Sequence, residues 1–285
     1  MIQGRIIKGV GGLYFVAADG LVYECAARGI FRKKKIIPTI GDNVEISVQS
    51  AREKKGTIES IMPRRNCLIR PRVANIDCAV ITFAAKSPDI NFDLLDRFLV
   101  LAEYQKIEDI VICINKSDLS AAEKISGIYS PIYRVFHVSA LENDGIKPLG
   151  EYLRGKVSVL AGPSGVGKSS IINRLIPGET RMTGEISRKI ERGRHTTRQV
   201  ELLGAGSDTY IVDSPGFTSL SLDLIKPEEL QHYFKEFEPY LDGCRFNDCR
   251  HIAEPGCVLK EHVGREISRE RYERFVKLYE MLSDN

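Results

Sequence analysis

A glycine-rich stretch near the middle of the chain, Ala161–Ser169, constrains the fold more than any other feature. The apolar run Val157–Leu160 precedes it and is typical of a buried strand, while apolar residues at helical spacing follow it as far as Ile176. The pattern therefore predicts strand, tight turn and helix. Glycines in such a turn let backbone N–H groups converge on an anion, and this spacing is that of a phosphate-binding loop.

The phosphate-binding interpretation assigns a role to each residue of the loop. We expect Lys168 to reach the β- and γ-phosphates of a nucleotide, and the Ser169 hydroxyl to hold Mg²⁺. The alternative is a glycine-rich turn without a ligand. The residues expected to surround the phosphates are Gly162, Pro163, Ser164, Gly165, Val166, Gly167, Lys168 and Ser169.

Length and composition limit the classes of protein to which this chain can belong. A chain of 285 residues is long for a single domain, and its 43% apolar content is ordinary for a soluble protein. The start of the chain has no apolar signal region, and no apolar run approaches the roughly 18 to 20 residues of a membrane span. We expect a cytoplasmic monomer without membrane contact. Its seven cysteines are then thiols or metal ligands, and Cys78 and Cys113 in apolar runs suit buried inert thiols.

Residues 1–65 read as five short strands separated by glycine turns, which fits a small all-β barrel, most plausibly an OB-fold. This segment holds twelve Lys/Arg against six Asp/Glu, including Arg32–Lys35 and the pairs Lys54-Lys55 and Arg64-Arg65. Basic loops on a barrel of this kind favour contact with RNA. The alternative for Arg32–Lys35 is a solvated loop.

From Ile76 the sequence alternates between predicted strands and helices, and we assign residues 66–225 to an α/β domain. A strand over Glu108–Ile114 ends in Asn115-Lys116-Ser117-Asp118. Ligands of open α/β sheets bind at the carboxyl ends of strands. A carboxylate there accepts hydrogen bonds from N1–H and the exocyclic amine of guanine, which adenine cannot offer. Together with a phosphate loop in the same sheet, Asn115–Asp118 predicts a guanine site.

Further pieces of a GTPase site follow strands. The strand predicted over Ile132–Val138 ends in Ser139-Ala140-Leu141, which we expect to bring backbone N–H groups to the guanine oxygen. Thr183–Arg198 reads as a long loop, in which Thr197 is preferred over Thr196 to close on Mg²⁺ and the γ-phosphate. Asp213 would hold Mg²⁺ through water, and the Gly216 N–H would sense the γ-phosphate.

The order of these pieces is unusual, because the guanine-reading segments precede the phosphate loop. With the basic barrel, Gly193-Arg194-His195-Thr196-Thr197 and a terminal cysteine cluster, the chain resembles the circularly permuted GTPases of the RsgA family, also called YjeQ or YloQ. The resemblance covers essentially the whole chain. It implies an α/β P-loop GTPase domain in permuted order, between an N-terminal OB-fold and a small C-terminal helical zinc-binding domain.

Residues 226–285 carry that cysteine cluster. Cys244, Cys249, His251 and Cys257 lie within fourteen residues, and three thiols with one imidazole suit tetrahedral Zn²⁺. Their spacing is not that of a common zinc finger, and the resemblance supports the structural zinc; the alternative is buried thiols beside a core histidine. A helical stretch is predicted over Leu230–Leu241. The charged helix predicted over Arg265–Leu282 is either a solvated face or an RNA contact.

Catalysis requires an oriented water. Phe217 occupies the position that a glutamine fills in Ras-like enzymes, so we expect slow intrinsic hydrolysis. His195 is the available substitute, and the resemblance points to the same residue; contact with RNA or packing under the loop is the alternative. We expect catalysis by His195, Lys168 and Thr197 and Mg²⁺ held by Ser169, Thr197 and Asp213.

The resemblance implies hydrolysis of GTP to GDP coupled to the 30S subunit and its 16S rRNA during late assembly. A GTP-gated RNA-binding chaperone, in which hydrolysis is incidental, is the alternative. A P-loop ATPase or small-molecule kinase fits less well, because no adenine or acceptor site is recognisable.

Overall fold

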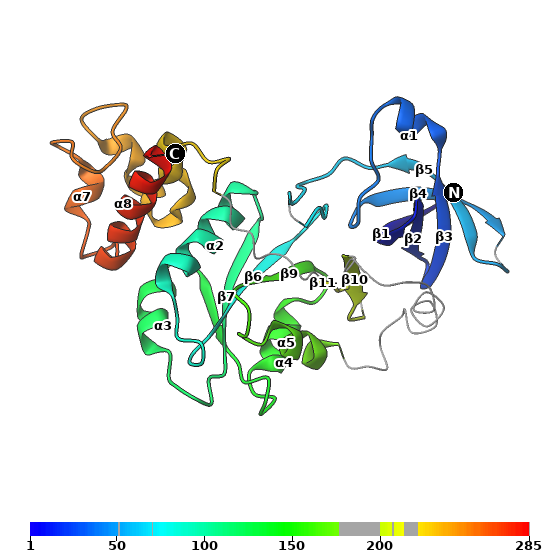
Figure 1. The fold of residues 1–285 in the computed structure, drawn as a ribbon, viewed down its shortest axis with the longest axis horizontal. Coiled ribbons are helices and arrows are strands. Elements are labelled where there is room, and N and C mark those ends of the chain that lie inside the picture. Colours follow the sequence, from blue (N-terminus) through cyan, green and yellow to red (C-terminus); the bar gives the residue numbers. More distant parts are fainter. Residues whose placement is uncertain (51, 70, 177–199, 207, 214–221, 285) are drawn as a thin grey trace.

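A computed structural model describes residues 1–50, 52–69, 71–176, 200–206, 208–213 and 222–284. Three parts follow one another along the molecule: a barrel near the N-terminus, a central α/β domain, and a helical module near the C-terminus (Figure 1). Within the described residues, no helix has the length and apolar character needed to cross a bilayer.

Five strands form the closed N-terminal barrel, in the order β1-β2-β3-β5-β4. They are β1 (Ile2–Val10), β2 (Leu13–Ala18), β3 (Leu21–Ala27), β4 (Asn43–Ser50) and β5 (Lys55–Ile61). Alternate residues such as Ile6, Val16 and Ile46 are fully buried inside it, as the two-residue period of a strand requires. A short helix, α1 (Gly29–Lys33), lies between β3 and β4 and inserts Phe31 into this core.

The basic residues of the barrel divide into two groups. Arg64 donates to the buried carboxylate of Asp42 at 2.6 and 2.8 Å, and Arg65 pairs with Asp77. These two guanidinium groups therefore have structural partners. Residues 32–35, by contrast, are exposed beside α1.

The central sheet has six strands in the order β10-β11-β9-β6-β7-β8. They are β6 (Cys78–Ala84), β7 (Asp109–Asn115), β8 (Arg134–His137), β9 (Val157–Ala161), β10 (Glu201–Gly204) and β11 (Tyr210–Asp213). Five of them run parallel, and β10 pairs antiparallel with β11 at one edge. Every residue of β6 is buried, which accounts for its uninterrupted apolar sequence.

Helices cover both faces of this sheet. α2 (Phe92–Tyr104) and α3 (Glu123–Tyr129) pack on one face, and α4 (Ile146–Tyr152) and α5 (Lys168–Leu175) pack on the other. Asn91 caps α2 by accepting a hydrogen bond from the backbone of Leu94 at 2.9 Å. Cys78 and Cys113 lie in the second of these cores as free thiols, and burial raises the pKa of Cys113 to about 12.

Four helical elements build the C-terminal module. They are the 3₁₀ helices η2 (Pro227–Tyr233) and η3 (Lys235–Gly243) and the α-helices α7 (Val258–Glu261) and α8 (Arg269–Ser283). The continuous helical stretch predicted over residues 230–241 is wrong, because Phe234 has extended φ and ψ angles of −105° and 93°. This break lets the Phe234 ring pack 5.2 Å from that of Phe275 in the core of the module.

A buried ion-pair network joins the module to the central domain. Asp96 of α2 accepts hydrogen bonds from Arg271 at 2.5 Å, from Tyr129 at 2.7 Å and from Arg274. Glu236 of η3 accepts from Arg271 at 2.6 and 2.9 Å. Both interpretations of the charged helix, a solvated face or an RNA contact, are therefore wrong for Arg271 and Arg274, because their side chains are only 0% and 9% exposed.

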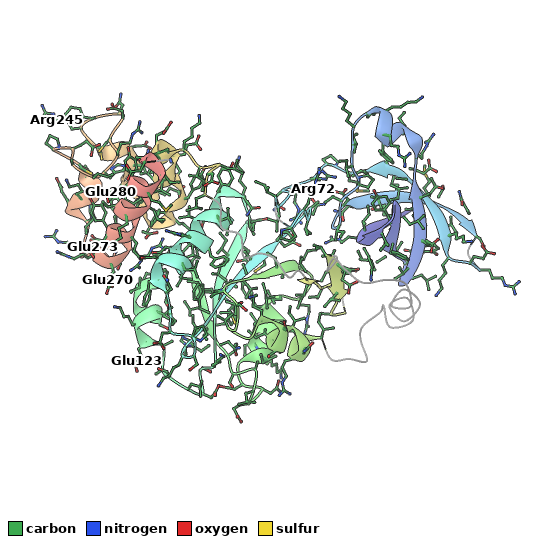
Figure 2. The ribbon with its side chains drawn as sticks, in the orientation of Figure 1. Arg72, Glu123, Arg245, Glu270, Glu273 and Glu280 are labelled. Carbon is green, nitrogen blue, oxygen red and sulfur yellow. The ribbon has the colours of Figure 1, made fainter. Side chains whose placement is uncertain are left out.

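The outer face of α8 does carry exposed charge. Glu273 and Glu280 are exposed along it, whereas Glu270 is partly buried and pairs with Lys124 at 3.0 Å (Figure 2). Within single turns of α8, some charged side chains therefore face solvent while others are buried.

Candidate nucleotide site and metal centre

The carboxyl ends of three parallel strands define the candidate nucleotide site. β6 lies between β7 and β9, so Asn115 at the end of β7 and the loop after β9 are two strand positions apart. Such an edge is where open α/β sheets bind ligands. The base-reading and phosphate-binding segments, 47 residues apart between Asn115 and Gly162 in the chain, are therefore close in space.

Asn115 links the two segments directly. Its Nδ2 donates to the carbonyl of Val166 at 2.8 Å, and its Oδ1 accepts from the backbone N–H of Ala140 at 3.1 Å. The side chain is 2% exposed, so neither half of the amide is satisfied by water. A Cβ on Gly167 would lie 2.2 Å from Nδ2 of Asn115, which explains a glycine at this position.

Lys116, like Asn115, reaches from the base-reading segment to the phosphate loop. Its ammonium group donates to the carbonyl of Gly165 at 3.0 Å and to that of Ser87. Ser117 donates its backbone N–H to Val138 at 3.1 Å, and Asp118 follows with an exposed side chain beside the cavity. The carboxylate of Asp118 therefore stands where a base can reach it.

The phosphate loop is held by close backbone packing. Gly162 has φ of +147°, and a Cβ there would lie 2.0 Å from the carbonyl oxygen of Thr82. Pro163 and Gly162 turn their carbonyls to Lys168, which donates to them at 2.7 and 2.8 Å. Ser164 and Ser169 are exposed.

Burial lowers the pKa of Lys168, and a phosphate beside it would favour the charged form. Lys168 and Ser169 also open α5, whose first backbone N–H groups favour an anion.

A cavity of about 470 Å³ lies between the base-reading segments and α5. It is lined by Asn115, Lys116, Asp118, Leu119, Ala140, Leu141, Gly167, Ser170, Asn173 and Arg174. Leu119 and Leu141 are 52% and 74% exposed, and apolar side chains at a polar rim suit the faces of a purine. The sequence patterns did not indicate Leu119, Ser170, Asn173 or Arg174, because none belongs to a spaced motif.

Ser139 and Ala140 begin a tight turn that lines the cavity through Ala140 and Leu141. Ser139 exchanges two backbone hydrogen bonds with Asp144, at 3.0 and 3.1 Å, and its hydroxyl accepts from the N–H of Glu142 at 3.1 Å. The side chain of Ser139 is buried, so it shapes the turn and does not face a ligand.

The predicted switch residues are only partly visible. His195, Thr197 and Gly216 lie outside the described residues. Asp213 is the last residue of β11, which runs parallel to β9, so its backbone approaches the sheet edge that carries the phosphate loop. Nothing is described of its side chain.

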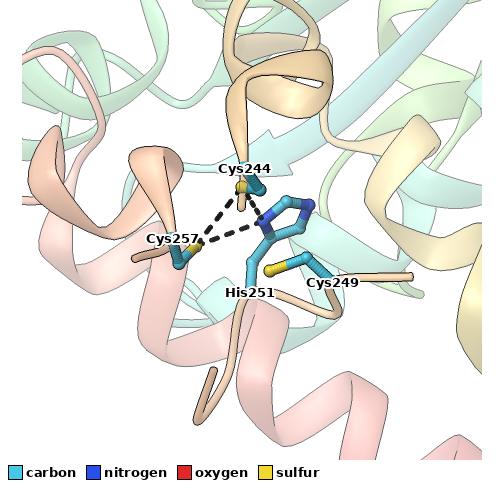
Figure 3. A group of neighbouring side chains, drawn as sticks. All are labelled: Cys244, Cys249, His251 and Cys257. Carbon is cyan, nitrogen blue, oxygen red and sulfur yellow. Dashed lines mark hydrogen bonds between the residues drawn. The ribbon is translucent and has the colours of Figure 1, made fainter. Parts of the chain in front are cut away.

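The four predicted metal ligands converge in the C-terminal module (Figure 3). One ligand atom from each of Cys244, Cys249, His251 and Cys257 lies within 4.8 Å of the others. The Sγ atoms of Cys244 and Cys257 are 3.8 Å apart, and they lie 3.4 and 3.3 Å from Nδ1 of His251. Cys249, His251 and Cys257 are buried.

These distances fit a tetrahedral metal site. Zn²⁺ with bonds of about 2.3 Å to sulfur and about 2.0 Å to nitrogen separates two sulfurs by about 3.8 Å and a sulfur from a nitrogen by about 3.5 Å. The alternative of unrelated buried thiols does not account for four donor atoms that share one centre. The cluster can therefore hold a metal ion, and its donor set favours zinc.

Family models match most of the chain. The RsgA GTPase model matches residues 61–223, and the RsgA N-terminal domain model matches residues 3–58. The chain belongs to the RsgA GTPase family. This membership confirms the resemblance inferred from the permuted motifs, and it identifies the chain as a GTP hydrolase of that family.

Individual RsgA relatives match over nearly their full lengths. A small ribosomal subunit biogenesis GTPase RsgA from Alkaliphilus metalliredigens is 46% identical across 100% of this chain and 99% of its own length. One from Caldanaerobacter subterraneus is 48% identical, covering 97% of this chain and 94% of the relative.

Two solved structures share the architecture. YjeQ from Thermotoga maritima superposes with a TM-score of 0.87 at 36% identity, covering 100% of this chain and 99% of YjeQ. YloQ, described as a circularly permuted GTPase, gives 0.83 at 34% identity, covering 100% and 96%. The predicted fold class, a permuted α/β GTPase domain between a barrel and a C-terminal metal module, is confirmed.

Proposed function

We propose that the protein binds and hydrolyses GTP in a cycle coupled to the small ribosomal subunit during its late assembly. The observation that carries the GTP site is the side chain of Asn115, which joins the phosphate loop to the base-reading turn through Val166 and Ala140. The ribosomal role is supported by relatives named small ribosomal subunit biogenesis GTPases, at 46% and 48% identity.

Roles divide among the three parts. Residues 1–65 form an RNA-binding domain for 16S rRNA, residues 66–225 the GTPase domain, and residues 226–285 a domain stabilised by Zn²⁺. Within the GTPase domain, Asp118 selects guanine, Lys168 neutralises the β- and γ-phosphates, and Mg²⁺ supplies charge compensation at the phosphates when held by Ser169, Thr197 and Asp213.

The guanine assignment is tested by Asp118→Asn. An amide in place of the carboxylate can donate to the C2 oxygen of xanthine but loses its pairing with the C2 amine of guanine. We expect the affinity for GDP to fall by about 10²-fold or more, because the amide N–H of the variant would face the C2 amine of guanine. The affinity for xanthosine diphosphate (XDP) should rise, because the same N–H can donate to the C2 oxygen of xanthine. Titration calorimetry measures both.

Glu142→Gln is the matched control, because it removes an exposed carboxylate from the turn next to the cavity. It should leave both affinities unchanged. An Asp118→Asn protein that still prefers GDP to XDP would remove Asp118 from base recognition.

Coupling to the ribosome is tested by turnover. Phe217 cannot orient water, so we expect slow hydrolysis alone and strong stimulation by 30S subunits, by analogy with the roughly 10³- to 10⁵-fold that a completing residue supplies in other GTPases. His195→Ala should keep GTP binding and lose the stimulated rate. Unchanged stimulated turnover would exclude His195 from the mechanism, and GTP-dependent 30S binding without stimulation would favour the chaperone alternative.

A further inference from the structure

Arg174 of α5 also contacts the base-reading turn, through different atoms from those that Asn115 contacts. Its Nε donates to the carbonyl of Ala140 at 2.8 Å, and its Nη2 donates to the carbonyl of Leu141 at 3.0 Å. The planar guanidinium thus holds two successive carbonyls with a rigid fork of donors. α5 is also the helix that begins with Lys168, so its position is set by the phosphate loop.

The turn needs such an anchor at these carbonyls. Residues 141–144 are exposed, and Ser139 closes the turn through Glu142 and Asp144 rather than through the carbonyls of Ala140 and Leu141. Asn115 Oδ1 accepts the N–H of Ala140 at 3.1 Å. The peptide units of Ala140 and Leu141 are therefore held by Asn115 through an N–H and by Arg174 through two carbonyls.

We propose that Arg174 is a positioning residue for guanine selectivity: by fixing the Ala140 and Leu141 carbonyls against α5, it aims the backbone N–H of Leu141, which lies opposite the Ala140 carbonyl in the same trans peptide, into the base cavity. The proposal rests on the proposed GTP site and adds a residue to it. An N–H donor suits the C6 oxygen of guanine and opposes the C6 amine of adenine, because two donors cannot pair. Asp118 would read the N1 and C2 edge, and Arg174 would act, through the turn, on recognition at C6.

The two contributions are separable with a modified base. 6-Thioguanine keeps N1–H and the C2 amine for Asp118 but presents a weak sulfur acceptor at C6. Loss of Arg174 should therefore weaken binding of GDP more than binding of 6-thio-GDP. A general loss of folding would weaken both equally.

The experiment measures GDP, 6-thio-GDP and ADP affinities by calorimetry for the whole protein and three variants. For Arg174→Ala we expect a GDP affinity lower by about tenfold, the size of one lost charged hydrogen bond, and a change for 6-thio-GDP below about threefold. Arg174→Lys keeps the charge but not the planar fork of donors, so its GDP affinity should lie between those of the unmodified protein and Arg174→Ala. Lys147→Ala removes an exposed positive charge from the neighbouring helix α4 and should change neither affinity.

The outcomes separate this proposal from the proposed function. If the unmodified protein binds ADP as tightly as GDP, the guanine site itself is wrong. If it prefers GDP but Arg174→Ala reduces GDP and 6-thio-GDP equally, or reduces neither, the positioning role of Arg174 is overturned. Circular dichroism of Arg174→Ala checks that the helix content of the variant is retained.

Discussion

Removing the buried carboxylate of Asp96 should lower the free energy of unfolding strongly. Asp96 is fully buried and accepts from Arg271, Arg274 and Tyr129, while Glu236 compensates the second positive charge. Asp96→Ala leaves two guanidinium groups, which stay charged, with a single carboxylate. Removing one partner of a buried ion pair costs about 3–5 kcal/mol, because the remaining charge keeps its desolvation penalty.

Denaturant unfolding followed by far-ultraviolet circular dichroism measures this loss, because the chain has no tryptophan to report on it. We expect the free energy of unfolding to fall by about 3–5 kcal/mol in Asp96→Ala. Asp93→Ala is the matched control on α2: its carboxylate is exposed in the first turn, and its loss should cost less than about 1 kcal/mol. A loss below about 1 kcal/mol in Asp96→Ala would refute the electrostatic argument.

A second substitution tests the cause of the loss. Adding Arg274→Met to the Asp96→Ala protein removes a cation that no longer has its partner and fills the space with an apolar side chain. Part of the lost stability should return, because the penalty came from unpaired charge. A further decrease equal to that of Arg274→Met alone would indicate that the two side chains contribute independently.

Two further predictions concern the phosphate loop and the metal centre. Gly162→Ala should abolish GDP binding and lower the unfolding free energy by about 1–3 kcal/mol, because its Cβ would meet the carbonyl of Thr82 at 2.0 Å. Gly155 also has a positive φ, but a Cβ there would lie in open space, so Gly155→Ala should keep GDP binding. Titration calorimetry measures GDP binding for both variants. Cys244→Ser should lose bound zinc by elemental analysis and unfold the C-terminal module, whereas Cys67→Ser should keep one zinc per chain. Full zinc content in Cys244→Ser would contradict the assigned ligand set.

Several features of the protein could be predicted from local spacing. The strand, turn and helix around Ala161–Ser169 follow from a pattern whose backbone geometry is set by its own glycines and apolar period. The metal donors could also be predicted from the sequence, because three cysteines and a histidine within fourteen residues suit a tetrahedral metal. The permuted order of the motifs, together with the basic barrel, the stretch Gly193–Thr197 and the cysteine cluster, was sufficient to indicate the family.

Other features depend on partners far away in the chain. Arg271 and Arg274 look like part of a solvated charged helix until α2 brings Asp96, 175 residues from Arg271, against them. Arg174 belongs to no motif, and only its contact with the Ala140 turn singles it out. A local pattern specifies the backbone of its own segment, because period and turn residues act over a few positions. Whether a charged side chain faces water or a buried partner is decided by the packing of distant elements, because burial and pairing are properties of the assembled fold.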